Sequence, residues 1–161
     1  MRKNVVPVCW WLAVTLICGM IFSFSSQDAS DSTDTSIGLI RTVINIFPAT
    51  KDLPDDIKDD ICKSLDKVVR KTAHFLIFAS LGFFAIGAAD STWEKVSVLL
   101  VLLCCAFYAG TDEFHQLFVK GRAGRFTDVL IDTCGSAFGI GCYILLCKII
   151  KGVVVCHLQK N

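Results

Sequence analysis

The chain of 161 residues has almost no excess charge of either sign. Its 16 Lys and Arg residues oppose 15 Asp and Glu residues, which leaves a formal net charge of +1. A chain so balanced has no overall positive field to attract nucleic acid, so we expect no such partner. The sequence also lacks a Cys-x-x-Cys pair, an HExxH pattern, a nucleophile elbow and a glycine-rich phosphate loop. The common sequence signatures of zinc, redox and hydrolase sites are therefore missing.

Hydrophobic residues are abundant, and charged residues are confined to a few segments. Hydrophobic residues make up 53% of the chain and the mean hydropathy is +0.58, too apolar for a soluble domain or a disordered tail. Four windows carry almost no charge: residues 4–27, 72–89, 96–111 and 129–147, the last interrupted by Asp132. Such windows predict membrane-spanning helices at about 5–24, 72–89, 96–111 and 129–147. The sequence thus predicts an all-α polytopic membrane protein, a four-helix bundle in a single domain over residues 1–161.

The cysteines fit the same interpretation. Seven of the nine lie inside the apolar windows, where cysteine behaves as a small hydrophobic residue. Cys62 and Cys156 lie outside the windows and on opposite sides of the predicted membrane. We therefore expect no disulfide framework. We also expect Cys62 to be accessible to a membrane-impermeant reagent.

The first apolar window has two interpretations. Ser23 and Ser25 are small enough for the cleavage site of a signal peptide. However, the apolar run from residue 5 to 24 is longer than the ~7–15 residues of a usual signal-peptide core. We therefore interpret it as the first span.

Residues 25–71 form the one long connection, with nine Asp and seven Lys or Arg. Two apolar rows at helical spacing predict amphipathic surface helices, the second starting after Pro54. The rows are Ile40, Val43, Ile44 and Phe47, then Ile57, Ile61, Leu65 and Val68. We expect these helices to lie along the membrane surface or to cap the bundle. The favoured interpretation is a solvated amphipathic linker without a role in the site.

Polar residues gather at one end of the four predicted spans. In an antiparallel bundle, the end of the first span, the start of the second, the end of the third and the start of the fourth meet at one membrane face. The candidate binding residues at this face are Ser26, Gln27, Lys71, His74, Asp112, Glu113, Gln116, Arg122, Arg125, Asp128 and Asp132. The stripe through Asp128 and Asp132 continues in Gly135 and Gly139, which predicts close packing against a neighbouring helix.

Carboxylates in a membrane need partners, because burying one costs roughly 2.5–3.5 kcal/mol at the bilayer centre. We expect Arg122 or Arg125 to contact the pair Asp112 and Glu113, since a short loop joins them. We expect Asp128 on the same side of the bundle as this contact, and Lys71 and His74 on the opposite side. The alternative is that these ion pairs only lock the helices in register.

The motifs at this face resemble those of the VanZ-like family of bacterial membrane proteins. They are FSSQ at residues 24–27, RKTAHF at 70–75, DEFHQLF at 112–118 and GRAGRFTDVLIDTCGSAFG at 121–139. The resemblance covers nearly the whole chain except the acidic connection. Asp132 is a departure, because the family often has Asn there. The resemblance implies a role in the cell envelope and a link to glycopeptide, particularly teicoplanin, tolerance.

Two main hypotheses for function follow. The first is a binding protein whose polar face recognises a membrane lipid headgroup or a lipid-linked cell-wall intermediate, with cations holding an anion. The alternative is an intramembrane enzyme acting on a lipid-linked phosphate or sugar, with Mg²⁺ or Mn²⁺ bound by Asp112, Glu113 and Asp128. A small transporter is a further alternative, but the opposite face is poor in polar groups.

The distribution of Lys and Arg predicts the orientation. Six cations lie on the side of the termini: Arg2, Lys3, Lys95, Lys148, Lys151 and Lys160. The short loop on the other side has three, and the long connection has seven. Because the first helix usually dominates orientation, we expect a cell-membrane protein with both termini cytoplasmic and the polar site and residues 25–71 outside.

Overall fold

The structure is a computed structural model that describes the backbone of residues 2–158 and the side chains of residues 6–151. The described backbone forms five helices and no strand: α1 (Arg2–Ser25), α2 (Ala29–Ile46), α3 (Asp55–Thr92), α4 (Val98–Gln116) and α5 (Phe126–Leu158). Four segments are long and apolar enough to span a membrane: Val6–Ser25, Asp55–Thr92, Val98–Gln116 and Phe126–Lys151. The prediction of an all-α fold with four spanning helices is confirmed.

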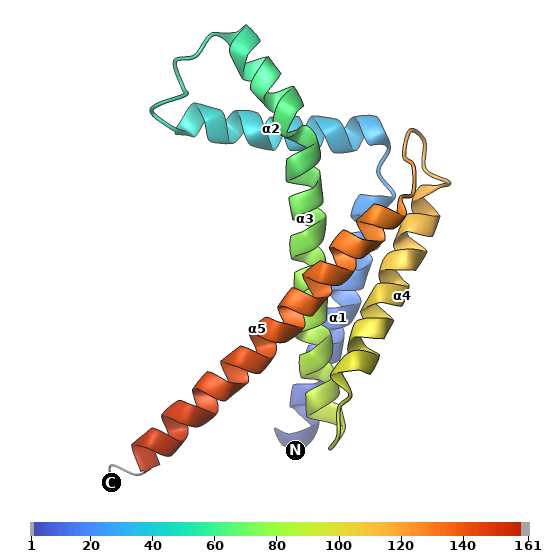
Figure 1. Ribbon diagram of the computed structural model, residues 1–161, viewed down its shortest axis with the longest axis vertical. Helices are drawn as coiled ribbons and strands as arrows, with labels where there is room; N and C mark the ends of the chain where they lie inside the picture. The colour runs from blue at the N-terminus through green and yellow to red at the C-terminus, as the bar shows by residue number, and fades with distance from the viewer. Residues whose placement is uncertain (1, 159–161) are drawn as a thin grey trace.

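Helix α3 is the longest element and runs through the centre of the bundle (Figure 1). Its 38 residues extend about 57 Å, roughly twice the thickness of the hydrocarbon core. The prediction of a separate surface helix after Pro54 is wrong. The helix that begins there continues without interruption into the second membrane span. The helix contains no proline, and its first glycine is Gly82, so nothing breaks it at the membrane boundary.

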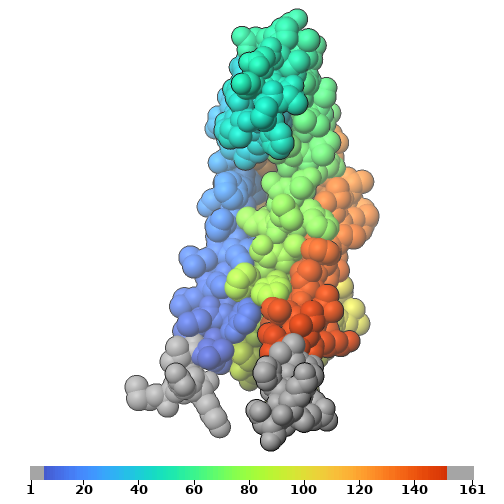
Figure 2. Space-filling view, turned by 90° about the vertical axis from the view of Figure 1, so that its left-hand side faces the viewer, coloured from blue at the N-terminus to red at the C-terminus, as the bar shows by residue number. Residues whose placement is uncertain are grey.

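Helix α2 crosses α3 at one end of the bundle (Figure 1). Together with the connection and the first turns of α3, it projects beyond the rest of the bundle (Figure 2). Ile40 and Ile44 of α2 are buried against Cys62 of α3. Cys62 is 1% exposed, so the expectation that it is accessible to an impermeant reagent is wrong.

The two amphipathic rows of the connection are only partly buried. Ile40, Ile44 and Ile61 pack between α2 and α3, whereas the remaining large side chains of both rows are exposed. The exposed members are Val43, Phe47, Ile57, Leu65 and Val68. Helical periodicity therefore identified an apolar face but not which part of it the neighbouring helix covers.

The four spanning helices share one core, and α3 packs against both α1 and α5. Ile21 of α1, Phe78 and Leu81 of α3, and Cys105 and Ala109 of α4 form its buried centre. Because α1 contributes to this core, it is a structural part of the bundle.

Helix α5 lies tilted across α3, and glycines allow the close approach (Figure 1). A Cβ atom at Gly135 or Gly139 would overlap the main-chain oxygen of Phe75 or Ala79 on α3. Gly82 of α3 is equally close to the main chain of α5. This contact is the close packing that the spacing of Gly135 and Gly139 predicts.

Candidate functional site

The polar ends of the helices surround a cavity of about 490 Å³. Helices α1, α2, α3, α4 and α5 and the α4–α5 loop all contribute to its wall. Nine of the eleven candidate residues line it: Gln27, Lys71, His74, Glu113, Gln116, Arg122, Arg125, Asp128 and Asp132. Asp112 is buried beside the cavity wall. Ser26 instead donates to the Phe22 carbonyl and lies 3.2 Å from His115 Nε2.

Helix α2 supplies one wall of the cavity, so the interpretation of the connection as a linker outside the site is wrong. Ser32, Thr35, Ser36 and Leu39 of α2 all line it. Their spacing places them on one helical face, a signal that the sequence contained. The Ser36 hydroxyl also donates to buried Asp66 of α3, whose other carboxylate oxygen accepts from Arg70 at 2.9 Å.

Lys71 and Asp128 join α3 to α5 at the cavity. The distance from Lys71 Nζ to Asp128 Oδ1 is 2.5 Å, and both side chains are partly exposed. We expected Asp128 and Lys71 on opposite sides of the bundle, which is wrong. The tilt of α5 across α3 brings the first turn of α5 to the α3 side.

In the two arginines of the α4–α5 loop, neither guanidinium pairs with a carboxylate, and only the main-chain amide of Arg125 reaches one. The Arg125 amide donates to Glu113 Oε2 at 2.8 Å, and Arg122 Nη2 donates to the Phe24 carbonyl at 3.0 Å. Between residues 6 and 151, no ion pair joins either guanidinium to a carboxylate. Arg125 therefore contacts Glu113, as expected, but through its main-chain amide and not through its charged side chain. Gly121 turns the loop with φ +75°, a conformation that favours glycine.

Asp112, Glu113 and Gln116 form a buried cluster at the end of α4. Each is less than 8% exposed. Gln116 Nε2 lies 3.3 Å from a carboxylate oxygen of both acids, as expected for residues three and four apart on a helix. Glu113 is held further by the Arg125 amide, so this cluster connects α4 to the start of α5.

A second cluster consists of the partly buried His74 of α3 and the buried Asp112 of α4 and Asp132 of α5. One possible metal-ligand atom from each lies within 4.8 Å of the others. The predicted metal ligands were Asp112, Glu113 and Asp128, and the structure brings only Asp112 of these into the cluster. Sequence spacing within one helix could not find a group whose members come from three helices.

The residues that line the cavity carry more positive than negative charge, with Asp112 and Asp66 buried behind them. Five cationic side chains line it: Lys67, Arg70, Lys71, Arg122 and Arg125. Three carboxylates line it as well, so the lining carries two more cations than anions if His74 is neutral. Burial, together with the nearby Arg70 guanidinium, lowers the pKa of Arg122 below its ordinary range. Arg122 Nε is buried and has no hydrogen-bond partner among the residues whose side chains the structure describes.

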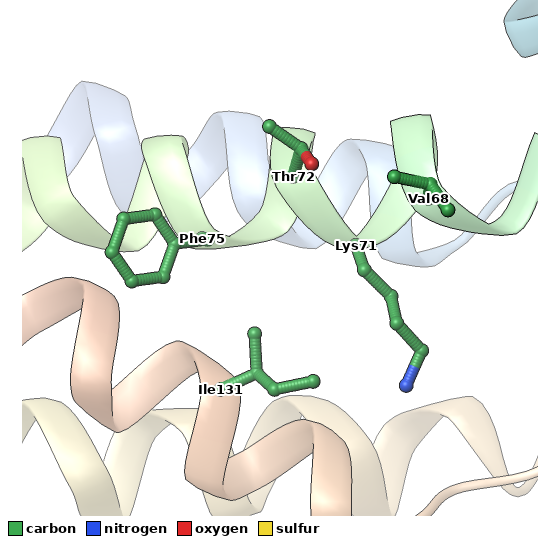
Figure 3. Close-up of a pocket in the computed structure, with 5 residues that line it drawn as sticks. All are labelled: Val68, Lys71, Thr72, Phe75 and Ile131. Carbon is green, nitrogen blue, oxygen red and sulfur yellow. The ribbon is translucent and has the colours of Figure 1, made fainter. Parts of the chain in front are cut away.

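A second, apolar groove adjoins the polar cavity on the outer side of α3 and α5. Val68, Thr72 and Phe75 of α3 face Ile131 of α5, and Lys71 extends along its edge (Figure 3). The groove has a volume of about 290 Å³. Lys71 and Ile131 line both spaces, so the groove and the cavity meet at these residues.

Comparison with known proteins identifies the chain by family. The family model described as VanZ/LLP1 matches residues 10–148, which include all the candidate residues, two of the spanning segments in full and most of the first and the last. No curated protein and no solved structure matches the chain. Because the match covers most of its length, this membrane-spanning chain belongs to the VanZ/LLP1 family.

Proposed function

We propose that the protein binds a membrane lipid with an anionic, phosphate-bearing headgroup, such as a lipid-linked cell-wall intermediate. The headgroup occupies the polar cavity, and an acyl or prenyl chain lies in the apolar groove beside it. The observation that carries this proposal is the buried, unpartnered Arg122 Nε in a cavity with excess positive charge.

The surroundings of Arg122 favour an anionic ligand more strongly than the positive charge of its side chain alone would. Partial burial of the guanidinium is unfavourable and the adjacent Arg70 adds repulsion, and these two effects outweigh the attraction of the nearby Asp112, Glu113 and Asp28 carboxylates. A phosphate between Arg70 and Arg122 would supply acceptors for both guanidinium groups, which bind phosphate well in bidentate geometry. The cavity is therefore better suited to an anion than to a cationic or neutral headgroup.

The adjoining groove supports a lipid rather than a free phosphate. Val68, Phe75 and Ile131 present apolar surface beside Lys71, whose ammonium group lies at the polar cavity. A lipid phosphate contacted by Lys71 would have its chain directed along this groove (Figure 3). The groove lies between two spanning helices, where a hydrocarbon chain is available from the bilayer.

Thermal unfolding of the purified protein in detergent, with a polyprenyl monophosphate, phosphatidic acid or inorganic phosphate, tests this proposal. A lipid at a hundred times its dissociation constant stabilises by about 2.7 kcal/mol, a rise in Tm of about 5–10 °C. Both lipids should stabilise the protein, whereas inorganic phosphate at the same concentration should not. If inorganic phosphate stabilises the protein as much as the lipids do, the groove does not bind a lipid chain. If neither lipid nor inorganic phosphate raises Tm, the proposal is wrong.

Two variants with a matched control locate the binding site. Arg122→Gln and Arg70→Gln should each weaken lipid binding about tenfold or more, because each removes hydrogen bonds to a charged group. Lys63→Gln removes an exposed cation of α3 outside the cavity and should bind as the wild type does. Equal losses in all three variants would indicate non-specific attraction to the lipid surface.

Family membership extends this proposal to the cell. We propose that the protein contributes to teicoplanin tolerance, with the cavity on the outer side of the cell membrane and both termini in the cytoplasm. Cells carrying Arg122→Gln should then become more susceptible to teicoplanin while the amount of protein in the membrane stays unchanged. Parallel loss of protein and tolerance would favour a purely structural role for the residue.

A further inference from the structure

The carboxylate of Asp132 is buried, and it has no hydrogen-bond partner among residues 6–151. The residue is 1% exposed, and neither of its oxygens accepts a hydrogen bond within the described part of the chain. Its nearest cationic candidate is His74 Nδ1 at 3.8 Å, beyond hydrogen-bond distance. A buried carboxylate without partners is costly, so these oxygens need a ligand.

Two further donors lie around the same point. His74 and Asp112 each place one possible ligand atom within 4.8 Å of the Asp132 carboxylate and of each other. Donors around a tetrahedral ion with bonds of about 2.0–2.1 Å lie about 3.3 Å apart, so small side-chain rotations bring the three into range. Each donor comes from a different helix, so the backbone positions them independently.

We propose that His74, Asp112 and Asp132 bind one divalent transition-metal ion, Zn²⁺ or Mn²⁺. One imidazole and two carboxylates suit these ions, whereas Mg²⁺ and Ca²⁺ prefer oxygen ligands alone. Two carboxylates also neutralise the charge of a divalent ion. Because His74 and Asp132 line the cavity, the ion has a coordination position directed towards it.

The metal ion and the lipid proposed above would interact. A divalent ion with three protein ligands can accept a phosphate oxygen as its fourth. The ion would then contact the headgroup on one side, while Arg70 and Arg122 would bind the same headgroup on the other side. This second step rests on the proposed lipid binding, whereas binding of the metal itself does not.

Metal content tests the site directly. The full chain, purified in detergent, is equilibrated with buffered Zn²⁺ or Mn²⁺ alone, and bound metal is measured by mass spectrometry. The wild type should hold about one ion per chain, as expected for a single site. Asp132→Asn and His74→Gln should each lose metal affinity by more than the roughly 10–100-fold that loss of a supporting residue costs. If the wild-type protein binds much less than one ion per chain, the proposal is wrong.

Two other variants separate this site from alternatives. Asp128→Asn should keep its metal, because Asp128 is paired with Lys71 outside the cluster. Loss of metal in Asp128→Asn but not in Asp132→Asn would overturn the ligand set. Asp60→Asn, an exposed change on α3, controls for non-specific binding. Asp132→Asn keeps the size of the side chain and removes its charge, so it should fold; if it does not, the wild type and His74→Gln decide the result.

Lipid binding with and without a chelator tests the interaction between metal and headgroup. Removal of the metal should weaken binding of the polyprenyl phosphate about tenfold or more, since a charged contact is lost. Unchanged lipid affinity in a protein that holds one ion would overturn the bridging step but leave the metal site. Metal binding without lipid binding would contradict the proposed function alone.

Discussion

The ammonium group of Lys71 in α3 lies 2.5 Å from a carboxylate oxygen of Asp128 in α5. This ion pair joins the two helices with the closest packing at the point where the polar cavity meets the apolar groove. Lys71 is 45% exposed and Asp128 is 27% exposed, so solvent screens their attraction. The pair therefore contributes little to the stability of the fold. Its main effect is to hold the two side chains in place at the edge of the cavity.

A double-mutant cycle with Lys71→Gln and Asp128→Asn measures this attraction. The coupling in the free energy of unfolding should be about 0.2–1 kcal/mol, as for other partly exposed pairs. It should fall in high salt, because the pair is accessible to screening ions. Thermal unfolding in detergent at two ionic strengths checks both points, and a coupling several times larger would indicate a drier environment.

Gly139 should tolerate no side chain, whereas Gly141 on the same helix should. A Cβ at Gly139 overlaps the main chain of α3, and nothing lies within 4 Å of a Cβ at Gly141. Gly139→Ala should destabilise the fold by about 1–3 kcal/mol, the usual cost of overpacking. Each kcal/mol lowers Tm by about 2–4 °C in a chain of this size. Equal Tm values for Gly139→Ala and Gly141→Ala would contradict the packing of α5 on α3.

Asp66 should hold α2 against α3. The Asp66 carboxylate accepts hydrogen bonds from Ser36 of α2 and from Arg70 of α3. Replacing Asp66 by alanine removes the acceptor of both hydrogen bonds. Asp66→Ala should weaken the docking of α2 by about 1.5–3 kcal/mol, as for other hydrogen bonds to charged groups. Trypsin cleavage at Arg41 should then become about tenfold faster or more. Asp60→Ala, an exposed change on the same helix, should leave the cleavage rate unchanged.

Two engineered cysteines test the orientation in place of buried Cys62. Ser64 lies on the exposed part of α3 near the cavity end, and Glu94 lies in the exposed turn between α3 and α4. In intact cells, an impermeant thiol reagent should label Ser64→Cys but not Glu94→Cys. The opposite pattern would place the cavity on the cytoplasmic side.

The spanning helices could be predicted from the sequence, because hydrophobicity over about 20 residues is a local property. The convergence of polar residues at one face could also be predicted, because connectivity alone places the ends of antiparallel helices. The same reasoning found the glycine stripe of Gly135 and Gly139. These predictions needed only helical periodicity and the order of segments along the chain.

The pairing of side chains could not be predicted, since it depends on the rotation and tilt of each helix. Lys71 contacts Asp128 because α5 crosses α3 at a slant, and Arg125 reaches Glu113 through its amide because the loop turns at Gly121. Proximity in sequence favoured the arginine side chains as partners instead. Similarly, the role of α2 as a cavity wall follows from its docking on α3.

By itself, the sequence determined the number of spanning helices, their apolar stretches and the end of the bundle at which polar groups collect. These follow from hydrophobicity and connectivity, which are independent of how helices pack. Only the tertiary structure decided that His74, Asp112 and Asp132 meet, and that the partly buried Arg122 lies near Arg70. The physical reason is that close packing at glycines and the length of α3 determine helix rotation and depth, which no single helix specifies alone.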